Sequence, residues 1–537
     1  MEKQRLDPRV TRRSLLALTV GAGTTILAAC STGDSQGAAA GSATGSGSRV
    51  LATDSLVQQV EDKRASSGRR VTAALTAAPF GTSVAGRAVQ TWGYNGRLPG
   101  PVLRARAGDT LSVVQHNRLT APTSVHLHGL ALRNNADGVA GLTQAATTPG
   151  SSFTATFKTS QPGTYWYHPH VGLQRERALY GPLIIDDPNE PLKYDAEWVL
   201  VLDDWLDGID GRTPEKEAAT LAGGMSGSGM SGMSGMSGMS GMSGMSGMGA
   251  GGSGMSGMSH KNGAAPASPF LGGDGGDVSY PAHLINGKSG VDPEVFTAKP
   301  GQRVRLRIIN AAGDTAYRVG IPGVTLTITH TDGYPVTHRQ ADAVVLGMGE
   351  RIDALITVPT RPVPLLSLAE GKTGSAFAIL AAGSGARPSM SSVPKTLTGQ
   401  VIESRSTTAD PAVQLPSRTV DVTHTLHLTG GMGRYDWGIN GRRFDMRDPY
   451  KSAFGIHAGE RVRLNFTNNT MMWHPMHLHG HTFQVGSTGP RKDTVIVKPM
   501  ETVSVFFDAD NPGQWLTHCH NAYHAERGMM AVVSYLR

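Results

Sequence analysis

Cysteine is nearly missing from this 537-residue sequence, which contains only Cys30 and Cys519. The two residues are far apart and each lies in a motif of its own, so we expect no disulfide bond. Stability must therefore come from packing. A chain of this length has room for three or four domains, each with its own core.

Dense charge is missing as well. The formal net charge is +7, and the sequence has no dense basic tract. Proteins that bind nucleic acid through its phosphates carry clustered lysine and arginine. We therefore expect no nucleic-acid partner. No sequence feature indicates an oligomer, and we expect a monomer.

Sustained helical periodicity is also missing, whereas an internal repeat is present. Three segments each contain a Gly turn and end with an Asn at the same offset from the Gly; they are 107–117, 300–310 and 458–468. In the second copy Val304, Leu306 and Ile308 alternate with arginines, which predicts a half-buried strand. An Asn-Gly pair, a frequent tight-turn signal, precedes each copy.

Short alternating segments with abundant Gly and Pro predict Greek-key β-sandwiches. We therefore expect an all-β protein with three consecutive β-sandwich domains. The predicted domains are residues 66–190, 191–390 and 410–537, and the middle one contains an insertion at 222–262.

Histidines are concentrated in four H-x-H pairs: His126 and His128, His168 and His170, His477 and His479, His518 and His520. On a strand, residues i and i+2 point to the same side, so each pair presents two imidazoles together. Eight imidazoles can hold three metal ions. Two pairs lie in the first predicted domain and two in the third, which predicts a metal cluster shared between them.

Cys519 stands between the two histidines of the last pair, and strand alternation points its thiol to the opposite face. A thiolate, two imidazoles and a weak axial thioether form the ligand set of an electron-transfer copper site. His524 and Met529 follow closely, and His474 lies just upstream of another pair. These four residues are the candidate ligands.

The motifs resemble the four copper signatures of the multicopper oxidases, a family that includes laccases, ascorbate oxidase and bacterial cuprous oxidases. The resemblance runs from about Val71 to the C-terminus and implies cupredoxin domains with four copper ions. It assigns His474, Cys519, His524 and Met529 to the type 1 copper, and His126 and His477 to the type 2 copper. The two type 3 coppers take His128, His168 and His520, and His170, His479 and His518.

The resemblance also implies a reaction. A reductant loses one electron at a time near an exposed edge of His524, the electrons cross the Cys519 backbone to His518 or His520, and O2 is reduced to water. Asp137 resembles the family's acid near the type 2 copper, and its alternative is an ordinary turn aspartate. Glu526 is the second candidate for proton transfer, one position after Ala525, where many relatives have glutamate.

Two features favour Cu(I) as the reductant. The insertion contains ten methionines from Met225 to Met258, with a repeat of Met at every third residue that begins at Met230, and thioethers suit Cu(I). Asp445 and Met446 resemble part of a stretch near the substrate-copper site of cuprous oxidases. The alternative for the insertion is a low-complexity linker that binds nothing in particular. The alternative for Asp445 and Met446 is an ordinary strand end.

We therefore predict copper detoxification by oxidation of Cu(I) to Cu(II). Two alternatives remain. One is a laccase-like oxidase of small phenols, with the same coppers and an open, methionine-free reductant site. The other is a copper-sequestering protein whose oxidase activity is incidental. A copper nitrite reductase is disfavoured because it would lack the paired type 3 histidines.

The N-terminus predicts export. Arg12-Arg13 and an apolar run that ends at Cys30 fit a twin-arginine lipoprotein signal at 1–30, and the alternative is an uncleaved anchor. Residues 31–65, rich in Ser, Gly and Ala near their start, predict a flexible tether. We expect lipidation of Cys30 and a place in the periplasm or on the outer face of the cell membrane.

Overall fold

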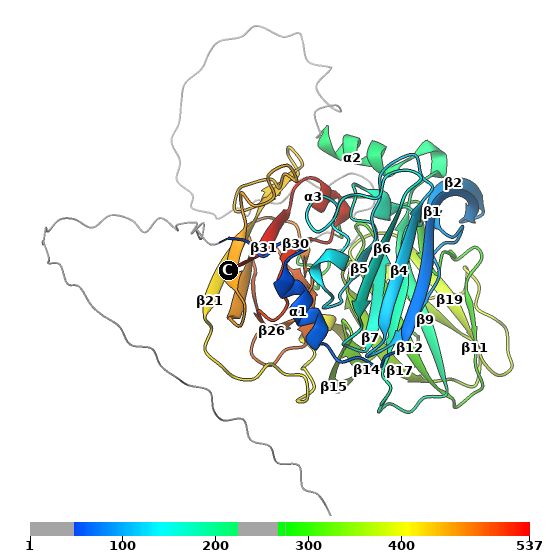
Figure 1. Cartoon of the computed structure of the whole chain (residues 1–537). Coiled ribbons are helices and arrows are strands. Elements are labelled where there is room, and N and C mark those ends of the chain that lie inside the picture. Colours follow the sequence, from blue (N-terminus) through cyan, green and yellow to red (C-terminus); the bar gives the residue numbers. More distant parts are fainter. Residues whose placement is uncertain (1–47, 224–266, 274) are drawn as a thin grey trace, which may run out of the picture. The chain divides into compact units, whose positions relative to one another are not determined.

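The computed structural model describes residues 48–223, 267–273 and 275–537 (Figure 1). The predicted leader, residues 31–47 of the tether and the methionine repeat lie outside the described residues. Within them, no helix combines the length and apolar character needed to cross a bilayer.

The last part of the predicted tether is folded, so the prediction of a flexible segment up to residue 65 is wrong for that part. Helix α1 (Ser55–Lys63) begins at Asp54, whose side chain accepts a hydrogen bond from the Leu56 amide. Val57 and Glu61 are buried, and Glu61 accepts from the Lys158 amide at 2.6 Å. The helix is short, and it follows a segment rich in Ser, Gly and Ala, so its amphipathic pattern is hard to recognise in the sequence.

Two sheets form the first sandwich. One contains β1 (Arg70–Val84), β2 (Arg87–Tyr94), β4 (Thr110–Asn117) and β6 (Ser152–Lys158). The other contains β3 (Leu103–Arg106), β5 (His126–His128), β7 (Gly163–His168) and β8 (Gly181–Asp186).

The second sandwich follows the same plan. One sheet contains β9 (Ala196–Trp205), β10 (Ala282–Ile285), β12 (Arg303–Asn310), β14 (Leu326–Thr331), β15 (Tyr334–Ala341) and β17 (Arg351–Thr357). The other contains β11 (Val295–Thr297), β13 (Tyr317–Gly320), β16 (Ala343–Leu346), β18 (Val363–Ala369), β19 (Ser375–Ala381) and β20 (Val401–Glu403). Helix α2 (Pro214–Ala222) follows β9.

The third sandwich contains the cysteine. One sheet contains β21 (Val422–Gly431), β22 (Asp436–Ile439), β24 (Arg461–Asn468), β26 (Phe483–Val485), β27 (Arg491–Lys492) and β29 (Thr502–Asp508). The other contains β23 (Phe454–His457), β25 (His474–Leu478), β28 (Thr494–Val497), β30 (Gln514–Cys519) and β31 (Met530–Leu536). Helix α3 (Ala522–Glu526) connects β30 to β31, its pairing neighbour (Figure 1).

The sequence repeat corresponds to one structural unit in each sandwich. Strands β4, β12 and β24 end at the repeated Asn, and each pairs in parallel with the first strand of its sandwich. Asn117, Asn310 and Asn468 each accept from the amide two residues later and donate to backbone carbonyls. In each sandwich the Asn side chain holds the loop that follows the strand in the same way. This shared pattern confirms that three similar β-sandwiches follow one another. The exact boundaries between them stay predictions.

The middle repeat strand differs from its prediction. β12 is buried on both faces after its first residue, so the prediction of a half-buried strand is wrong. Arg305 and Arg307 are each only 2% exposed because both contact Asp353, at 2.6 and 3.1 Å. Alternation of charge with apolar residues usually marks a solvated face, and here buried ion pairs replace the solvent.

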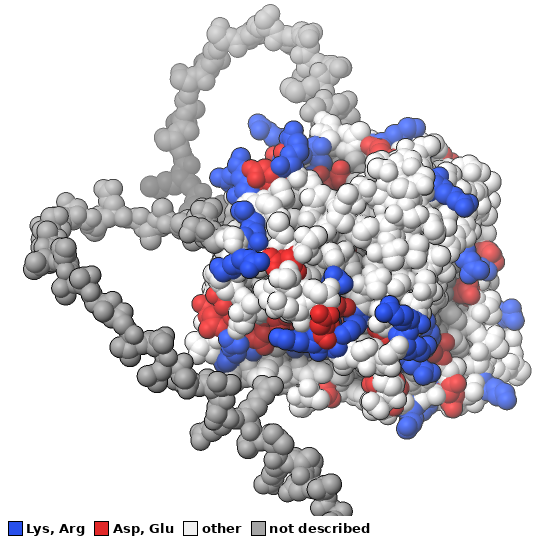
Figure 2. All heavy atoms as spheres, viewed as in Figure 1, with Lys and Arg blue, Asp and Glu red and all other residues white. Residues whose placement is uncertain are grey.

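The cores place the histidine pairs at a junction. Buried apolar residues of the first and third sandwiches form one continuous cluster, which includes Leu127 and Cys519. The second sandwich has its own core, to which Trp473 and Ile496 of the third sandwich contribute. The first and third sandwiches therefore pack together where the H-x-H pairs lie. On the face shown in Figure 2, positive and negative side chains of the described residues are interspersed.

Candidate metal centre

Strand pairing brings the four histidine pairs together. β5 pairs with β7 so that His126 lies opposite His168, and β25 pairs with β30 so that His477 lies opposite His518. In three of the four pairs the second histidine (His170, His479 or His520) follows the end of its strand, so only His126 and His128 lie on one strand together as alternation predicts. The first and third sandwiches each present two neighbouring pairs.

The imidazoles form overlapping groups of three whose ring nitrogens lie within 4.8 Å of one another: His126, His477 and His479; His126, His128 and His168; His170, His479 and His518. The third group is the set predicted for one type 3 copper. His126 and His477, predicted for the type 2 copper, also share a group. We call these seven residues and His520 the histidine cluster.

Most imidazoles of the histidine cluster have one ring nitrogen held by a protein acceptor. Nδ1 of His126, His168, His477 and His518 lies 2.7 to 2.9 Å from a backbone carbonyl oxygen. A carbonyl oxygen only accepts, so Nδ1 carries the proton and Nε2 keeps a free lone pair. The backbone thereby fixes which nitrogen can bind a metal.

Several of the remaining nitrogens are buried without a hydrogen-bond partner among the described residues: Nε2 of His126, His168 and His477, and Nδ1 of His128. Such groups cost free energy unless a ligand satisfies them. Imidazole nitrogen is a preferred ligand of copper, so the residues present fit copper ions held among them.

The charge state also suits a metal. Burial, followed by neighbouring positive groups, lowers the pKa of six histidines well below its ordinary value: His128, His168, His170, His479, His518 and His520. These rings are neutral at physiological pH. Metal binding needs the neutral form, so no proton has to be displaced.

Asp137 lies at the histidine cluster, and its side chain is only 1% exposed. One carboxylate oxygen lies 3.0 Å from Nδ1 of His479, and the other lies 3.2 Å from Nδ1 of His126. Gly138 has a φ of +85°, and a Cβ there would lie 1.9 Å from the Val125 carbonyl oxygen. The turn needs glycine, and it carries Asp137 to both predicted copper ligands.

His520 has a partner that sequence analysis missed. A guanidinium nitrogen of buried Arg175 lies 2.6 Å from its Nδ1, and another lies 2.5 Å from its carbonyl oxygen. The ring centroid of His520 is 5.0 Å from that of His128 and 5.4 Å from that of His168, with which it was predicted to share a copper. Its ligand role stays a prediction. Arg175 lies in no recognisable motif, so the sequence offered no signal for it.

A second site surrounds Cys519. Nδ1 of His474 and Nδ1 of His524 lie 3.0 Å apart, and the Cys519 sulfur lies 3.6 and 3.7 Å from them. All three residues are buried. Met529 is also buried, and its backbone bonds to those of Cys519 and His524. This set is the one predicted for the type 1 copper, and the structure brings its members together.

The outer nitrogens of both imidazoles at this site are engaged. Nε2 of His474 lies 2.8 Å from the Thr470 hydroxyl, and Nε2 of His524 lies 2.8 Å from the Asp277 carboxylate. Although burial opposes the charged form, His524 holds the pKa of Asp277 below its ordinary value. A carboxylate only accepts, so His524 carries its proton on Nε2 and directs Nδ1 at Cys519.

The prediction of an exposed His524 edge is therefore wrong. His524 is fully buried, and the side chain of Asp277 that covers Nε2 is only 1% exposed. The Tyr435 hydroxyl donates to the same carboxylate at 2.7 Å, and the Trp437 ring lies 4.2 Å from that of His524. Asp277 is more than two hundred residues from the histidine it covers, so local sequence patterns could not reveal it.

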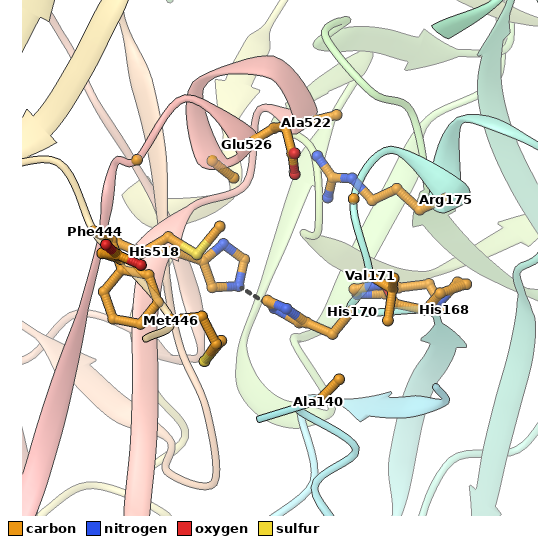
Figure 3. Close-up of a pocket in the computed structure, with 16 residues that line it drawn as sticks. Ala140, His168, His170, Val171, Arg175, Phe444, Met446, His518, Ala522 and Glu526 are labelled. Atoms are coloured by element: carbon orange, nitrogen blue, oxygen red, sulfur yellow. Dashed lines mark hydrogen bonds between the residues drawn. The ribbon is translucent and has the colours of Figure 1, made fainter. Parts of the chain in front are cut away.

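A cavity of about 380 Å³ borders the histidine cluster at His168, His170 and His518. His170 and His518 face each other there, with their Nε2 atoms 3.4 Å apart, and Met446 lies beside them (Figure 3). Glu526 of α3 is an exposed residue that also lines the cavity. Asp445 lines it too, where the Arg447 guanidinium binds its carboxylate at 2.6 Å. His474, His524 and Met529, which surround Cys519, do not line this cavity.

Comparison with known proteins gives one consistent result. The multicopper oxidase family pattern matches residues 80–190, 261–364 and 417–536. Multicopper oxidase MmcO of Mycobacterium tuberculosis is 42% identical over 98% of this chain and 97% of its own. A copper resistance protein A homolog of Pseudomonas syringae is 28% identical over 86% and 91%. The crystal structure of a multi-copper oxidase from Pseudomonas thermotolerans has a TM-score of 0.64, 28% identity, and coverage of 87% and 99%.

Replacing Cys519 tests the thiolate site. We expect Cys519→Ser to abolish the intense blue absorption of the copper-loaded protein and its turnover, because the thiolate ligand is lost. Copper bound by the histidine cluster should be largely retained. Absorption spectra and copper analysis by mass spectrometry measure both. The matched control is Cys30→Ser, which removes the other thiol and should leave the colour intact. A blue Cys519→Ser protein would refute the assignment.

Replacing Asp277 tests the cover over His524. The carboxylate favours the more positively charged state of the site, so Asp277→Asn should raise the reduction potential of the blue centre. A charged hydrogen bond worth about 1.5 kcal/mol corresponds to roughly 60 mV for one electron. Spectroscopic redox titration measures the potential, with Asp436→Asn, a change at an exposed aspartate, as the control. An unchanged or lower potential in Asp277→Asn would contradict the electrostatic role.

Proposed function

This chain belongs to the multicopper oxidase family of copper-dependent oxidoreductases that use O2, and we propose that it oxidises Cu(I) to Cu(II). Four such one-electron oxidations would reduce one O2 to water. The observation that carries the choice of reductant is the cover over His524. A phenol oxidase was expected to have an open site, whereas the described residues bury both imidazoles beside Cys519 and place an anionic carboxylate on the outer one.

Four copper ions are the proposed complement. His474, Cys519, His524 and Met529 would hold the type 1 ion, and His126 and His477 the type 2 ion. The type 3 ions would be held by His128, His168 and His520, and by His170, His479 and His518. When bound, copper supplies the one-electron carriers and the place where O2 is reduced.

The chain itself connects the two sites. Cys519 is covalently linked to His518 and His520, and its carbonyl oxygen accepts a hydrogen bond from Nδ1 of His518 at 2.9 Å. This bond offers a second short path from the cysteine backbone into the same imidazole. Burial of Cys519 and His518 keeps both positions fixed, which favours repeated electron transfer without rearrangement.

Two carboxylates are proposed to move protons. Asp137 accepts from Nδ1 of His479 inside the histidine cluster, so it would orient that ring and hold a proton there. Glu526 lies on the cavity that His170 and His518 border, and it is exposed to solvent. It would collect protons from water and release them into the cavity, in place of the glutamate that Ala525 displaces.

The place of the enzyme follows from the predicted leader. We propose export by the twin-arginine signal, lipidation at Cys30, and a monomer held at the outer face of a membrane. The methionine repeat between Met225 and Met258 would gather Cu(I) at that surface. The described residues that follow the insertion, 267–273 and 275–277, end at the carboxylate that covers His524.

The role of Asp445 and Met446 as a site for substrate copper also stays a prediction. Met446 is half-buried on the cavity beside His518, and Asp445 is engaged by Arg447. Laccase-like phenol oxidation remains the second candidate function, because the same coppers serve it. Copper sequestration with incidental oxidase activity is the third.

Oxygen uptake separates these functions. The copper-loaded protein would receive chelator-buffered Cu(I) in one assay and a methoxyphenol in another, without added Cu(II). We expect fast, saturable uptake with Cu(I) and slow uptake with the phenol, because a cation approaches the anionic Asp277 more easily than a neutral ring does. The reverse ranking would establish a laccase. Copper retention with no uptake in either assay would favour sequestration.

A deletion variant is the control for the insertion in the same assays. Removal of Met225 to Met258 should lower the rate at limiting Cu(I) and leave phenol oxidation unchanged or faster. Equal Cu(I) rates with and without the repeat would show that it is only a linker. The choice between Cu(I) and a phenol as reductant would then rest on the oxygen-uptake comparison.

Replacing Glu526 tests proton delivery. We expect Glu526→Gln to slow O2 consumption roughly 100-fold, the lower range for loss of a general acid, with a larger solvent deuterium isotope effect. Anaerobic bleaching of the blue absorption by reductant should be unchanged, because it needs no proton from the cavity. Asp436→Asn is the control, since Asp436 is an exposed acid that does not line the cavity. Normal O2 consumption by Glu526→Gln would remove this role.

A further inference from the structure

The middle sandwich supplies none of the predicted copper ligands, yet one of its loops touches the histidine cluster. The loop runs from residue 347 to 350, between β16 and β17. A Cβ on Gly349 would lie 2.9 Å from Cδ2 of His520 and 3.2 Å from Cε1 of His128. The Gly349 backbone therefore packs against rings from the first and third sandwiches. Its φ of +86° also requires glycine.

Arg351, directly after this loop, joins all three sandwiches and is fully buried. Its two terminal nitrogens each lie 2.7 Å from one oxygen of Asp493 in the third sandwich. Its Nε donates to the Thr164 carbonyl of the first sandwich at 3.1 Å, and Nη1 donates to the Gly349 carbonyl at 3.1 Å. A planar guanidinium bound on both sides holds the carboxylate in one orientation.

Asp493 passes this orientation to two members of the histidine cluster. Its Oδ1 lies 3.0 Å from Nε2 of His128, and its backbone carbonyl lies 2.9 Å from Nδ1 of His477. Because a carboxylate only accepts, His128 carries its proton on Nε2 and keeps the lone pair on Nδ1. His128 thus presents Nδ1 to the cluster, whereas His126, His168 and His477 present Nε2.

We propose that Arg351 and Asp493 are positioning residues for the histidine cluster, through which the middle sandwich selects the metal-binding nitrogen of His128. Without the carboxylate, Nε2 of His128 has no charged acceptor, so the tautomer that leaves Nδ1 free for a metal is no longer favoured. The inference rests on the proposed role of these histidines as copper ligands. It is independent of whether the reductant is Cu(I) or a phenol.

The test compares two buried ion pairs, each of which includes an arginine of the middle sandwich. Asp493→Asn and Arg351→Lys change the pair that contacts the cluster. Asp353→Asn and Arg305→Lys change an equally buried pair, joined at 2.6 Å, whose hydrogen bonds among the described residues involve no histidine of the cluster. All four proteins would be loaded with copper and measured for copper content, blue absorption, near-ultraviolet absorption of the coupled copper pair, and electron paramagnetic resonance.

We expect Asp493→Asn to weaken copper retention by the histidine cluster about 10- to 100-fold under chelator competition, as loss of a hydrogen-bonded partner of a ligating histidine does. The near-ultraviolet band should fall in parallel while the blue absorption persists. Arg351→Lys should act in the same direction more weakly, because a single ammonium cannot bind both oxygens. The two control variants should lower thermal stability without selective loss of cluster copper.

Wild-type copper retention and spectra in Asp493→Asn would overturn the proposal, and so would an equal loss in Asp353→Asn. The persistent blue absorption reports that the third sandwich is folded; if Asp493→Asn does not fold, the Arg351→Lys spectra decide. A wild-type protein with no copper and no near-ultraviolet band at the cluster would instead refute the proposed function. The two failures are therefore distinguishable.

Discussion

Each buried imidazole of the histidine cluster has two nitrogens, and the protein occupies one of them. Carbonyl oxygens hold Nδ1 of His126, His168 and His477, so only Nε2 remains for a metal. The oxygens that perform this selection belong to Asp137, Pro169 and Asp493, which lie in turns and connections next to the strands. The rest of the architecture follows from this constraint, because the strand registers must bring those oxygens and the facing lone pairs into place together.

Three repeated sandwiches meet this requirement by different contributions. The first and third supply the imidazoles and share one apolar core, which fixes the distance between their strands. The second supplies Gly349 and Arg351, whose contacts reach both neighbours. A buried ion pair adds little to the free energy of unfolding, but it fixes the orientation of the side chains that it joins. A ligand set divided between two sandwiches needs such an orienting contact.

The sequence predicts the three β-sandwiches, the eight paired histidines and the set around Cys519, because period-two alternation and local spacing express them directly. It fails where a contact joins residues distant in the chain. Arg175, Asp277 and Arg351 lie in no local motif, and each acts on a histidine through the tertiary fold. The alternating arginines of β12 misled for the same reason, since their partner Asp353 converts an apparently solvated face into a buried one.

Coverage of His524 has a chemical consequence for the choice of reductant. An imidazole edge open to solvent accepts an electron from any flat donor that stacks on it, so it selects weakly. Here Asp277 and its Tyr435 partner, a buried anionic hydrogen-bonded pair, cover that edge, and in the proposed function the donor would approach through them. An anion favours cations over neutral molecules of equal potential, and desolvation makes that preference steep. The same pair orients His524 toward Cys519, so in the proposed function both the choice of reductant and the ligand geometry would depend on one carboxylate.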